Sequence, residues 1–368
     1  MGAITGHIPG AQWSLFGAEL HIPDGFLNLP ISIVCWIGAI ALIAFAAQRA
    51  QRTLDERQMP LMGIMAAFIF AAQMINFPVA GGTSGHLLGG VLAAVTLGPW
   101  AGILVMTAVI AVQALLFQDG GLLVMGANIL NMGLITALIG YGLYRSVINQ
   151  RPAIRLALIG VAAWLSVMGA ALATSLQLWL SGTVPLDIVV PAMMSVHALI
   201  GIGEALITVA AVSFILRTRP EIMEAGAQRG ANRGWIIGGV IAALIVVVLS
   251  PLASADPDGL ERVAEDMGFI DLGQSAPYEI IPDYTVPFLG ETPLSTIVAG
   301  VIGTLVVAVV GGLVAQAVWG RGVGGGGWGG GGGGGGLGGG GGGFCFLFFF
   351  FCFFFSVFFF FVFHLKKQ

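Results

Sequence analysis

Two histidines in turn-rich segments are the first candidates for chemistry. His21 opens the segment HIPDGFLNLP, ahead of the first apolar stretch, and His86 closes NFPVAGGTSGH at the start of a short one. Imidazole is a common ligand of Ni, Cu, Zn and Co. No thiolate lies near either histidine and there is no H-E-x-x-H helix, which favours binding or transport of a metal ion over zinc-dependent proteolysis. Two plainer roles stay open: a turn residue for His21 and a hydrogen-bonding residue at a helix start for His86.

Small residues fill the five positions before His86, from Gly81 to Gly85. Glycine-rich turns can present backbone amides to phosphate, but the lysine of a G-x-x-x-x-G-K-[ST] loop is absent here. Glycine also allows backbone conformations with positive φ. We therefore expect a tight turn that carries His86 back toward the N-terminal segment, with an ordinary flexible loop as the alternative.

Two further ionisable residues, His197 and Glu204, lie within one apolar stretch, MMSVHALIGIGEAL. They are seven residues apart and so share one face of a helix. Ionisable side chains inside a membrane span are candidate functional residues. We nevertheless expect both to be structural, with Glu204 bonded to a polar partner on a neighbouring helix such as Asn128, Asn131 or Gln113.

The composition indicates the elements that must position these residues. Of the 368 residues 57% are hydrophobic and 9% are charged, whereas charged residues make up roughly 25% of an ordinary soluble domain. A net charge of -4 argues against a nucleic-acid partner, and the three cysteines have no paired spacing. The sequence predicts an all-α polytopic membrane helix bundle, with a seven-helix domain and a two-helix C-terminal module. The apolar stretches lie at 30–48, 60–77, 86–97, 100–117, 122–144, 155–181, 192–216, 235–253 and 294–319.

The third apolar stretch, 86–97, is too short for an ordinary span. It is rich in glycine and ends at Gly98-Pro99, which predicts a short or broken helix. Irregular backbone at membrane depth is tolerated where protein or a water-filled cavity covers it. We therefore expect the substrate site beside this stretch.

Basic residues indicate how the helices cross the membrane. Threading nine spans places ten arginines on one side, which the positive-inside rule makes cytoplasmic. The N-terminus and the loop 254–293 then lie outside, and that loop carries nine carboxylates that could concentrate cations. We expect a multi-pass protein of the cell inner membrane. The ten arginines are Arg49, Arg52, Arg57, Arg145, Arg151, Arg155, Arg217, Arg219, Arg229 and Arg233.

Neither end of the chain resembles an evolved structural element. Residues 1–19 lack the basic and apolar regions of a signal peptide, so we expect a spurious extension. Residues 322–343 include 19 glycines and 344–363 include 14 phenylalanines. Runs of G and of T encode such tracts, which favours a frameshift or sequencing error in 320–368 over a real linker and apolar anchor. The remaining parts are 20–217, the seven-helix domain; 218–234, a cytoplasmic linker; and 235–319, the two-span module.

Five motifs, in order, resemble the CbiM/NikM family, the substrate-capturing membrane subunits of nickel and cobalt energy-coupling-factor (ECF) transporters. The resemblance covers about residues 20–217. The segment SADPDGLERVAEDMGF, residues 254–269, resembles the PDGLE-type auxiliary module of these subunits. The motifs are HIPDGFLNLP, NFPVAGGTSGHLLGG, LLFQDGG, VMGANILNMG and HALIGIGEALIT.

The resemblance implies a transporter rather than an enzyme. Such a protein captures Ni(II) or Co(II) as its cargo, has no permanent cofactor, and works in the lipid membrane with a coupling subunit and ATP-binding-cassette ATPases encoded elsewhere. It also implies a ligand set of an N-terminal amine, the amide and imidazole of His21, and the imidazole of His86. The amine would belong to Leu20, which nineteen residues precede in this sequence. We therefore expect the functional chain to start at Leu20, through internal initiation or proteolysis.

Two other functions remain possible on the sequence. An intramembrane metal-dependent enzyme would need an acid or base beside the metal, and Glu204 is the single carboxylate in the predicted spans. An auxiliary assembly subunit without its own substrate would have no use for the paired histidine motifs. The module 235–319 has no histidine or cysteine in its outer loop, so we expect it to modulate transport, and its deletion to leave metal binding intact.

Overall fold

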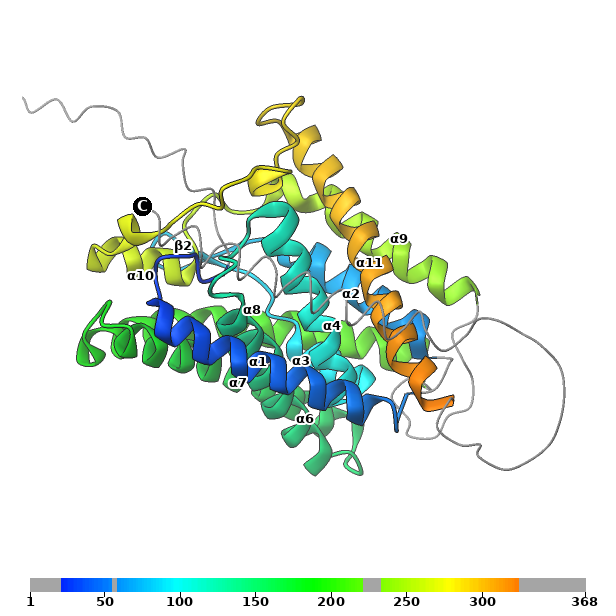
Figure 1. Cartoon of the computed structure of the whole chain (residues 1–368). Coiled ribbons are helices and arrows are strands. Elements are labelled where there is room, and N and C mark those ends of the chain that lie inside the picture. The colour runs from blue at the N-terminus through cyan, green and yellow to red at the C-terminus, as the bar shows by residue number, and fades with distance from the viewer. Residues whose placement is uncertain (1–20, 55–57, 221–232, 324–368) are drawn as a thin grey trace, which may run out of the picture.

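The computed structural model describes residues 21–54, 58–220 and 233–323 (Figure 1). The expected extension 1–19, Leu20, most of the linker 218–234 and the tail beyond residue 323 lie outside the described residues. The elements in chain order are α1 (Leu29–Ala50), α2 (Met59–Gln73), β1 (Phe77–Val79), β2 (Thr83–Gly85), α3 (Gly90–Leu97), α4 (Pro99–Val112), η2 (Gln113–Phe117), α5 (Met125–Asn128), η3 (Ile129–Ile135), α6 (Thr136–Ser146), α7 (Pro152–Leu180), α8 (Leu186–Thr218), α9 (Arg233–Leu249), η5 (Ser250–Leu252), α10 (Gly259–Met267), η6 (Ile270–Leu272), η7 (Pro282–Tyr284) and α11 (Pro293–Val323).

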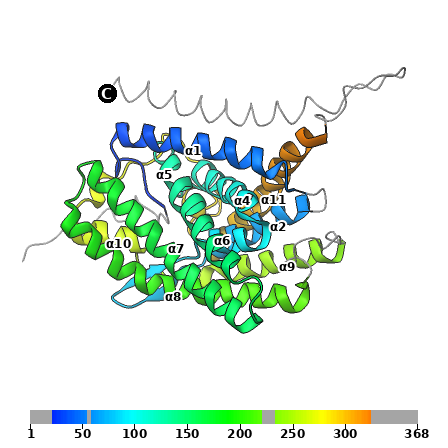
Figure 2. The same cartoon turned by 90° about the horizontal axis from the view of Figure 1, so that it is seen from below.

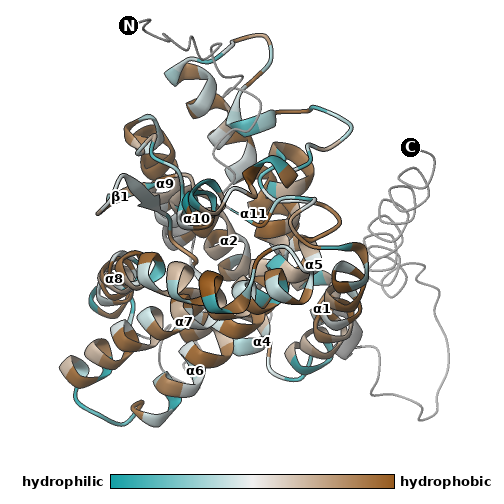
Figure 3. Cartoon of the chain, turned by 90° about the vertical axis from the view of Figure 1, so that its left-hand side faces the viewer, coloured by the Kyte–Doolittle hydropathy of each residue, from teal (hydrophilic) through white to brown (hydrophobic). Residues whose placement is uncertain are grey.

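Apolar helices dominate the described residues, which confirms the predicted helix bundle. Six helical segments are long and apolar enough to cross a membrane, and two shorter apolar helices are Met59–Gln73 and Ile236–Leu252. The glycine-rich third stretch forms the eight-residue helix α3, as expected for a short element. Figure 3 shows apolar residues along α1, α7 and α8, whereas α10 carries polar ones. Large exposed side chains such as Ile37, Leu172 and Leu206 give these helices an apolar outer surface suited to lipid.

Helix α4 forms the centre of the bundle (Figures 1 and 2). Its span, Pro99–Phe117, is 83% buried, compared with 33% for α1. It packs against α1, α2, α3 and α11, so apolar residues are required around its whole circumference. Helices α7 and α8 lie side by side and are joined by a short turn at Gly182, where φ is 75°.

The C-terminal module packs on the first domain through α2. Helices α9 and α11 both contact α2, and a Cβ atom at Gly63 would lie 2.7 Å from the carbonyl oxygen of Ala308. Glycine at this position therefore allows the two backbones to approach closely, as small residues do in other membrane bundles. Between α9 and α11 the chain leaves the bundle and folds across one of its ends, where α10 lies (Figure 1).

Three short irregular elements that the sequence did not predict surround the predicted site. β1 and β2 form an antiparallel hairpin, in which Phe77 pairs with Gly85. Gly81 and Gly82 in its turn have φ values of 83° and 67°, which confirms a tight turn before His86. The other two are the π-helical segments η2 and η3, a type of distortion often found at functional sites.

Candidate metal site

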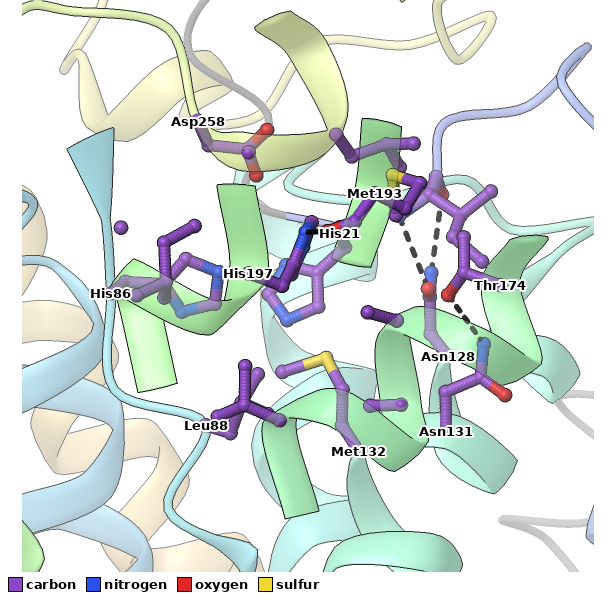
Figure 4. Close-up of a pocket in the computed structure, with 18 residues that line it drawn as sticks. His21, His86, Leu88, Asn128, Asn131, Met132, Thr174, Met193, His197 and Asp258 are labelled. Carbon is purple, nitrogen blue, oxygen red and sulfur yellow. Dashed lines mark hydrogen bonds between the residues drawn. The ribbon is translucent and has the colours of Figure 1, made fainter. Parts of the chain in front are cut away.

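A cavity of about 70 Å3 lies between the N-terminal segment, the end of β2, η3, α7, α8 and the start of α10 (Figure 4). The imidazoles of His21, His86 and His197 all line it. The structure thus brings together the two histidines predicted from the sequence and adds a third.

Asp119 holds the buried ring of His21. Its Oδ1 lies 2.7 Å from Nδ1 of His21. Burial by itself would raise the pKa of Asp119, but the nearby His21 and hydrogen bonds from His21 and Tyr284 hold this pKa below its usual range. An ionised Asp119 can accept a hydrogen bond from Nδ1–H of His21, and in the neutral ring with this tautomer Nε2 carries a lone pair.

Nε2 of His21 is buried and has no hydrogen-bond partner among the described residues. Buried polar atoms are otherwise nearly always paired, so an orphaned imidazole nitrogen calls for an explanation. In histidines that bind metals, the second ring nitrogen typically donates its N–H to a carboxylate, and Nδ1 of His21 faces Asp119 in this way. The arrangement therefore fits a histidine that is positioned to bind a metal ion.

His86 presents a second imidazole to the same cavity. Its ring centroid is 5.8 Å from that of His21, and the two planes are tilted by 35°. Nδ1 of His86 lies 3.0 Å from the carbonyl oxygen of Leu87. Because metal–imidazole bonds are about 2.0–2.1 Å long, two rings at this separation can share one ion with small adjustments.

Glu204 fixes the backbone next to His86. Its carboxylate accepts hydrogen bonds from the amides of Leu88, at 2.6 Å, and Gly89, at 3.1 Å, just before α3. Glu204 thus has polar partners on a neighbouring segment, as expected, but they are backbone amides and not the three side chains that the sequence suggested. Each of the three proposed partners has other bonds: Asn128 with Ile22, Asn131 with Thr174 and Gln177, and Gln113 with Tyr284.

The segment after His21 is held by α5 and by the loop that joins η2 to α5. The side chain of Asn128 accepts from the amide of Ile22 and donates to its carbonyl oxygen, both at 3.1 Å. Asp24 accepts from the amides of Leu122, Leu123 and Val124. Burial nevertheless raises the pKa of Asp24 to about 6, because the three hydrogen bonds only partly offset the loss of solvent. These contacts join the segment HIPDG to the loop that follows η2 and to α5.

His197, expected to be structural, also reaches the cavity. Its Nδ1 lies 2.8 Å from the carbonyl oxygen of Met193, one turn earlier in α8. Sequence reasoning placed only His21 and His86 near each other. The spacing of His197 and Glu204 was a signal that could have placed His197 near the site. The two residues share one face of α8, and Glu204 fixes the backbone beside His86.

The third predicted contributor, Leu20, lies outside the described residues. Within 21–54, 58–220 and 233–323, no group of three or more His, Cys, Asp and Glu side chains is arranged to hold a metal ion. The two imidazoles of His21 and His86 are therefore the part of the predicted ligand set that the structure brings together.

The fold and the cavity define a helical membrane protein with a histidine-lined candidate site for a transition-metal ion. Residues 21–222 match the CbiM family, described as a cobalt uptake substrate-specific transmembrane region, and residues 232–319 match the PDGLE domain. The chain belongs to the CbiM family and carries a PDGLE domain in the same polypeptide. This confirms the resemblance inferred from the motifs, and it makes the chain a metal transport component rather than an enzyme.

The names of several similar proteins refer to the transport of nickel, cobalt or a transition metal. A protein of Archaeoglobus fulgidus, provisionally named fused nickel transport protein NikMN, is 36% identical, over 78% of this chain and 95% of its own length. The fused nickel transport protein NikMN of Rhodobacter capsulatus is 29% identical, over 77% and 94%. The cobalt transport protein CbiM of Sorangium cellulosum is 31% identical, over 56% and 95%. A crystal structure of a truncated transition metal transporter shares 35% identity, covers 54% of this chain and 98% of its own, and has a TM-score of 0.49.

Proposed function

We propose that this chain is the substrate-specific membrane component of an ECF importer that captures Ni(II) or Co(II) outside the cell and delivers it inward. The ion would serve cobalamin synthesis or nickel enzymes. A transmembrane coupling subunit and ATP-binding-cassette ATPases, encoded elsewhere, would drive the transport step. The absence of a P-loop motif from the sequence supports this division of labour.

The observation that carries the proposal is the pair of buried imidazoles, in which one ring nitrogen of His21 faces Asp119 and the other has no hydrogen-bond partner among the described residues. Nitrogen ligands suit Ni(II) and Co(II), whereas Mg and Ca prefer oxygen. We further propose that the amine of residue 20 completes the ligand set with the amide of His21. A terminal amine there would add a nitrogen donor beside the two imidazoles.

We also propose that the protein lies in the cytoplasmic membrane with the cavity at the outer side. Asn28, just before α1, bonds to Ser181 at the end of α7, so these two ends lie beside the His21 segment. Arg49, Arg145 and Arg217 are in the last turns of α1, α6 and α8. Their clustering at the other ends of these helices supports a cytoplasmic position by the positive-inside rule.

Calorimetric titration of the chain purified from its native host tests the proposed function. We expect one Ni(II) or Co(II) ion per chain to bind, with Mg(II) giving no heat of binding at the same concentrations. The reason is that the cavity offers nitrogen donors rather than a shell of oxygens. Failure of both Ni(II) and Co(II) to bind would contradict the proposal.

Substitution Glu204→Gln should weaken metal binding, although residue 204 is not proposed as a metal ligand. Glutamine retains one acceptor oxygen, but its amide group faces one of the two backbone N–H groups, so the segment holding His86 loses a hydrogen bond. Loss of a residue that orients a ligand typically costs about 10–100-fold in affinity. Nickel calorimetry would measure the change.

The matched control is Asp187→Asn, an exposed carboxylate in the first turn of the same helix. Its affinity should equal that of the unaltered chain. Equal affinities for Glu204→Gln and the unaltered chain would show that Glu204 does not position His86.

A further inference from the structure

The outer loop of the C-terminal module covers the candidate metal site. It contacts three separate segments that hold the site: the residues after His21, the β1–β2 hairpin and the end of η2. The hydrogen bonds are Ser84 N to Pro257 O, 2.8 Å; Gln274 N to Asp24 O, 2.7 Å; and Tyr278 Oη to Leu115 O, 3.0 Å.

The start of α10 forms part of the cavity wall itself. Asp258, Gly259 and Leu260 line the cavity, and Asp258 caps α10 by accepting from the amide of Glu261. A Cβ atom at Gly259 would lie 2.6 Å from Cδ1 of Ile200 and 2.9 Å from Cε1 of His197. A larger residue at this position would require Ile200 or His197 to move, so glycine favours the close approach of α10 to the cavity.

A second part of the same loop, at Tyr284, is connected to the proposed ligand His21 by hydrogen bonds through Asp119. The hydroxyl of Tyr284 donates to Oδ2 of Asp119 at 2.6 Å, and Oδ1 of Asp119 faces Nδ1 of His21 at 2.7 Å. Both carboxylate oxygens of Asp119 are thereby engaged, one by each residue. The hydrogen bonds form a continuous chain from the module to the imidazole.

The local structure around Tyr284 restricts the orientation of its hydroxyl. The ring stacks on Phe117, with centroids 4.6 Å apart and planes 16° apart. Asp283 and Tyr284 have φ values of 49° and 56°, a region that residues other than glycine seldom adopt. Consecutive residues in such a conformation persist where surrounding contacts hold them and cluster at functional sites.

We propose that Tyr284 is a positioning residue for metal binding, which orients Asp119 and thereby fixes the ring and tautomer of His21. This inference rests on the proposed function, because it assumes that His21 binds the cargo ion. Without the Tyr284 hydroxyl, Oδ2 of Asp119 loses one hydrogen-bond donor, and the orientation of the carboxylate toward His21 is less restrained. Tyr284 would then couple the presence of the module to the affinity of the site.

The test compares Tyr284→Phe with Tyr278→Phe in the full-length chain. Phenylalanine keeps the ring that stacks on Phe117, so the first variant loses only the hydroxyl. Tyr278 lies in the same loop, but its hydroxyl donates to the carbonyl oxygen of Leu115 rather than to Asp119. We expect the nickel dissociation constant to rise about 10–100-fold for Tyr284→Phe and to stay unchanged for Tyr278→Phe.

A second measurement separates positioning from a general loss of structure. In metal-free protein, the ¹⁵N shifts of the His21 ring should report one tautomer, protonated at Nδ1, and a mixture in Tyr284→Phe. Unchanged affinity and an unchanged tautomer in Tyr284→Phe would overturn the proposal, as would equal weakening by Tyr278→Phe. If the unaltered chain binds no nickel or cobalt, the proposed function fails, while the tautomer shift still decides whether Tyr284 orients His21.

Discussion

Substitution His86→Ala is expected to abolish metal binding and uptake. The cavity offers the rings of His21 and His86 at a centroid separation of 5.8 Å, and removal of His86 leaves one imidazole of that pair. Hydrophobic neighbours such as Leu88 and Met132 cannot replace the lost nitrogen. Nickel and cobalt calorimetry on purified protein, together with uptake by cells, would measure the effect.

The comparison variant is His197→Ala, in the wall of the same cavity. We assign His197 a structural role, because its Nδ1 bonds to its own helix at Met193 and its ring packs against Gly259. This variant should lower the melting temperature and retain metal binding. If His86→Ala keeps normal uptake while His197→Ala loses metal binding, the roles of the two histidines are reversed.

A free amine on residue 20 is the second requirement with a large expected effect. A terminal amine has an unperturbed pKa of about 7.7–8.0 and can bind a metal once deprotonated, whereas a peptide nitrogen at Leu20 is neither basic nor terminal. We therefore expect the active chain to begin at residue 20. N-terminal sequencing of protein from the native host would establish the start. A mature chain that begins at Met1 and still binds nickel or cobalt tightly would refute the amine ligand.

Metal binding through the amine of residue 20 and the amide of His21 also requires a particular orientation of the His21 ring. A chelate between the amide nitrogen of His21 and its own ring can close only through Nδ1, which faces Asp119 in this structure. Binding in this mode requires the ring to turn over, so that Asp119 accepts from Nε2 instead. A carboxylate can accept from either nitrogen, and the Tyr284–Asp119 contact would serve both ring orientations.

The helices could be predicted from the sequence because lipid demands long apolar segments, and the glycines at 89, 90 and 98 predicted the short helix α3. The two candidate ligands could be predicted because His21 and His86 lie in turns shaped by glycine and proline. The β1–β2 hairpin was missed, since three-residue strands leave too little pattern to detect.

Long-range partners could not be predicted in the same way. Asp119 is 98 residues from His21 in the chain, and Tyr284 is 165 residues from Asp119, so no local spacing connects them. The acidic outer loop was interpreted as a solvated segment that modulates transport. In the structure Gly259 of this loop lines the cavity, and the hydroxyl of Tyr284 donates to Asp119. We therefore revise the expectation that deletion of the module leaves metal binding intact.

X-ray absorption spectroscopy of the nickel-loaded full-length protein tests the central claim most directly, because it reports the ligand atoms around the ion. We predict a first shell of nitrogen donors with outer-shell scattering from two imidazoles, His21 and His86, and scattering from one imidazole in any nickel retained by His86→Ala. A first shell of oxygen or sulfur without imidazole scattering would contradict the assignment of this cavity as the metal site.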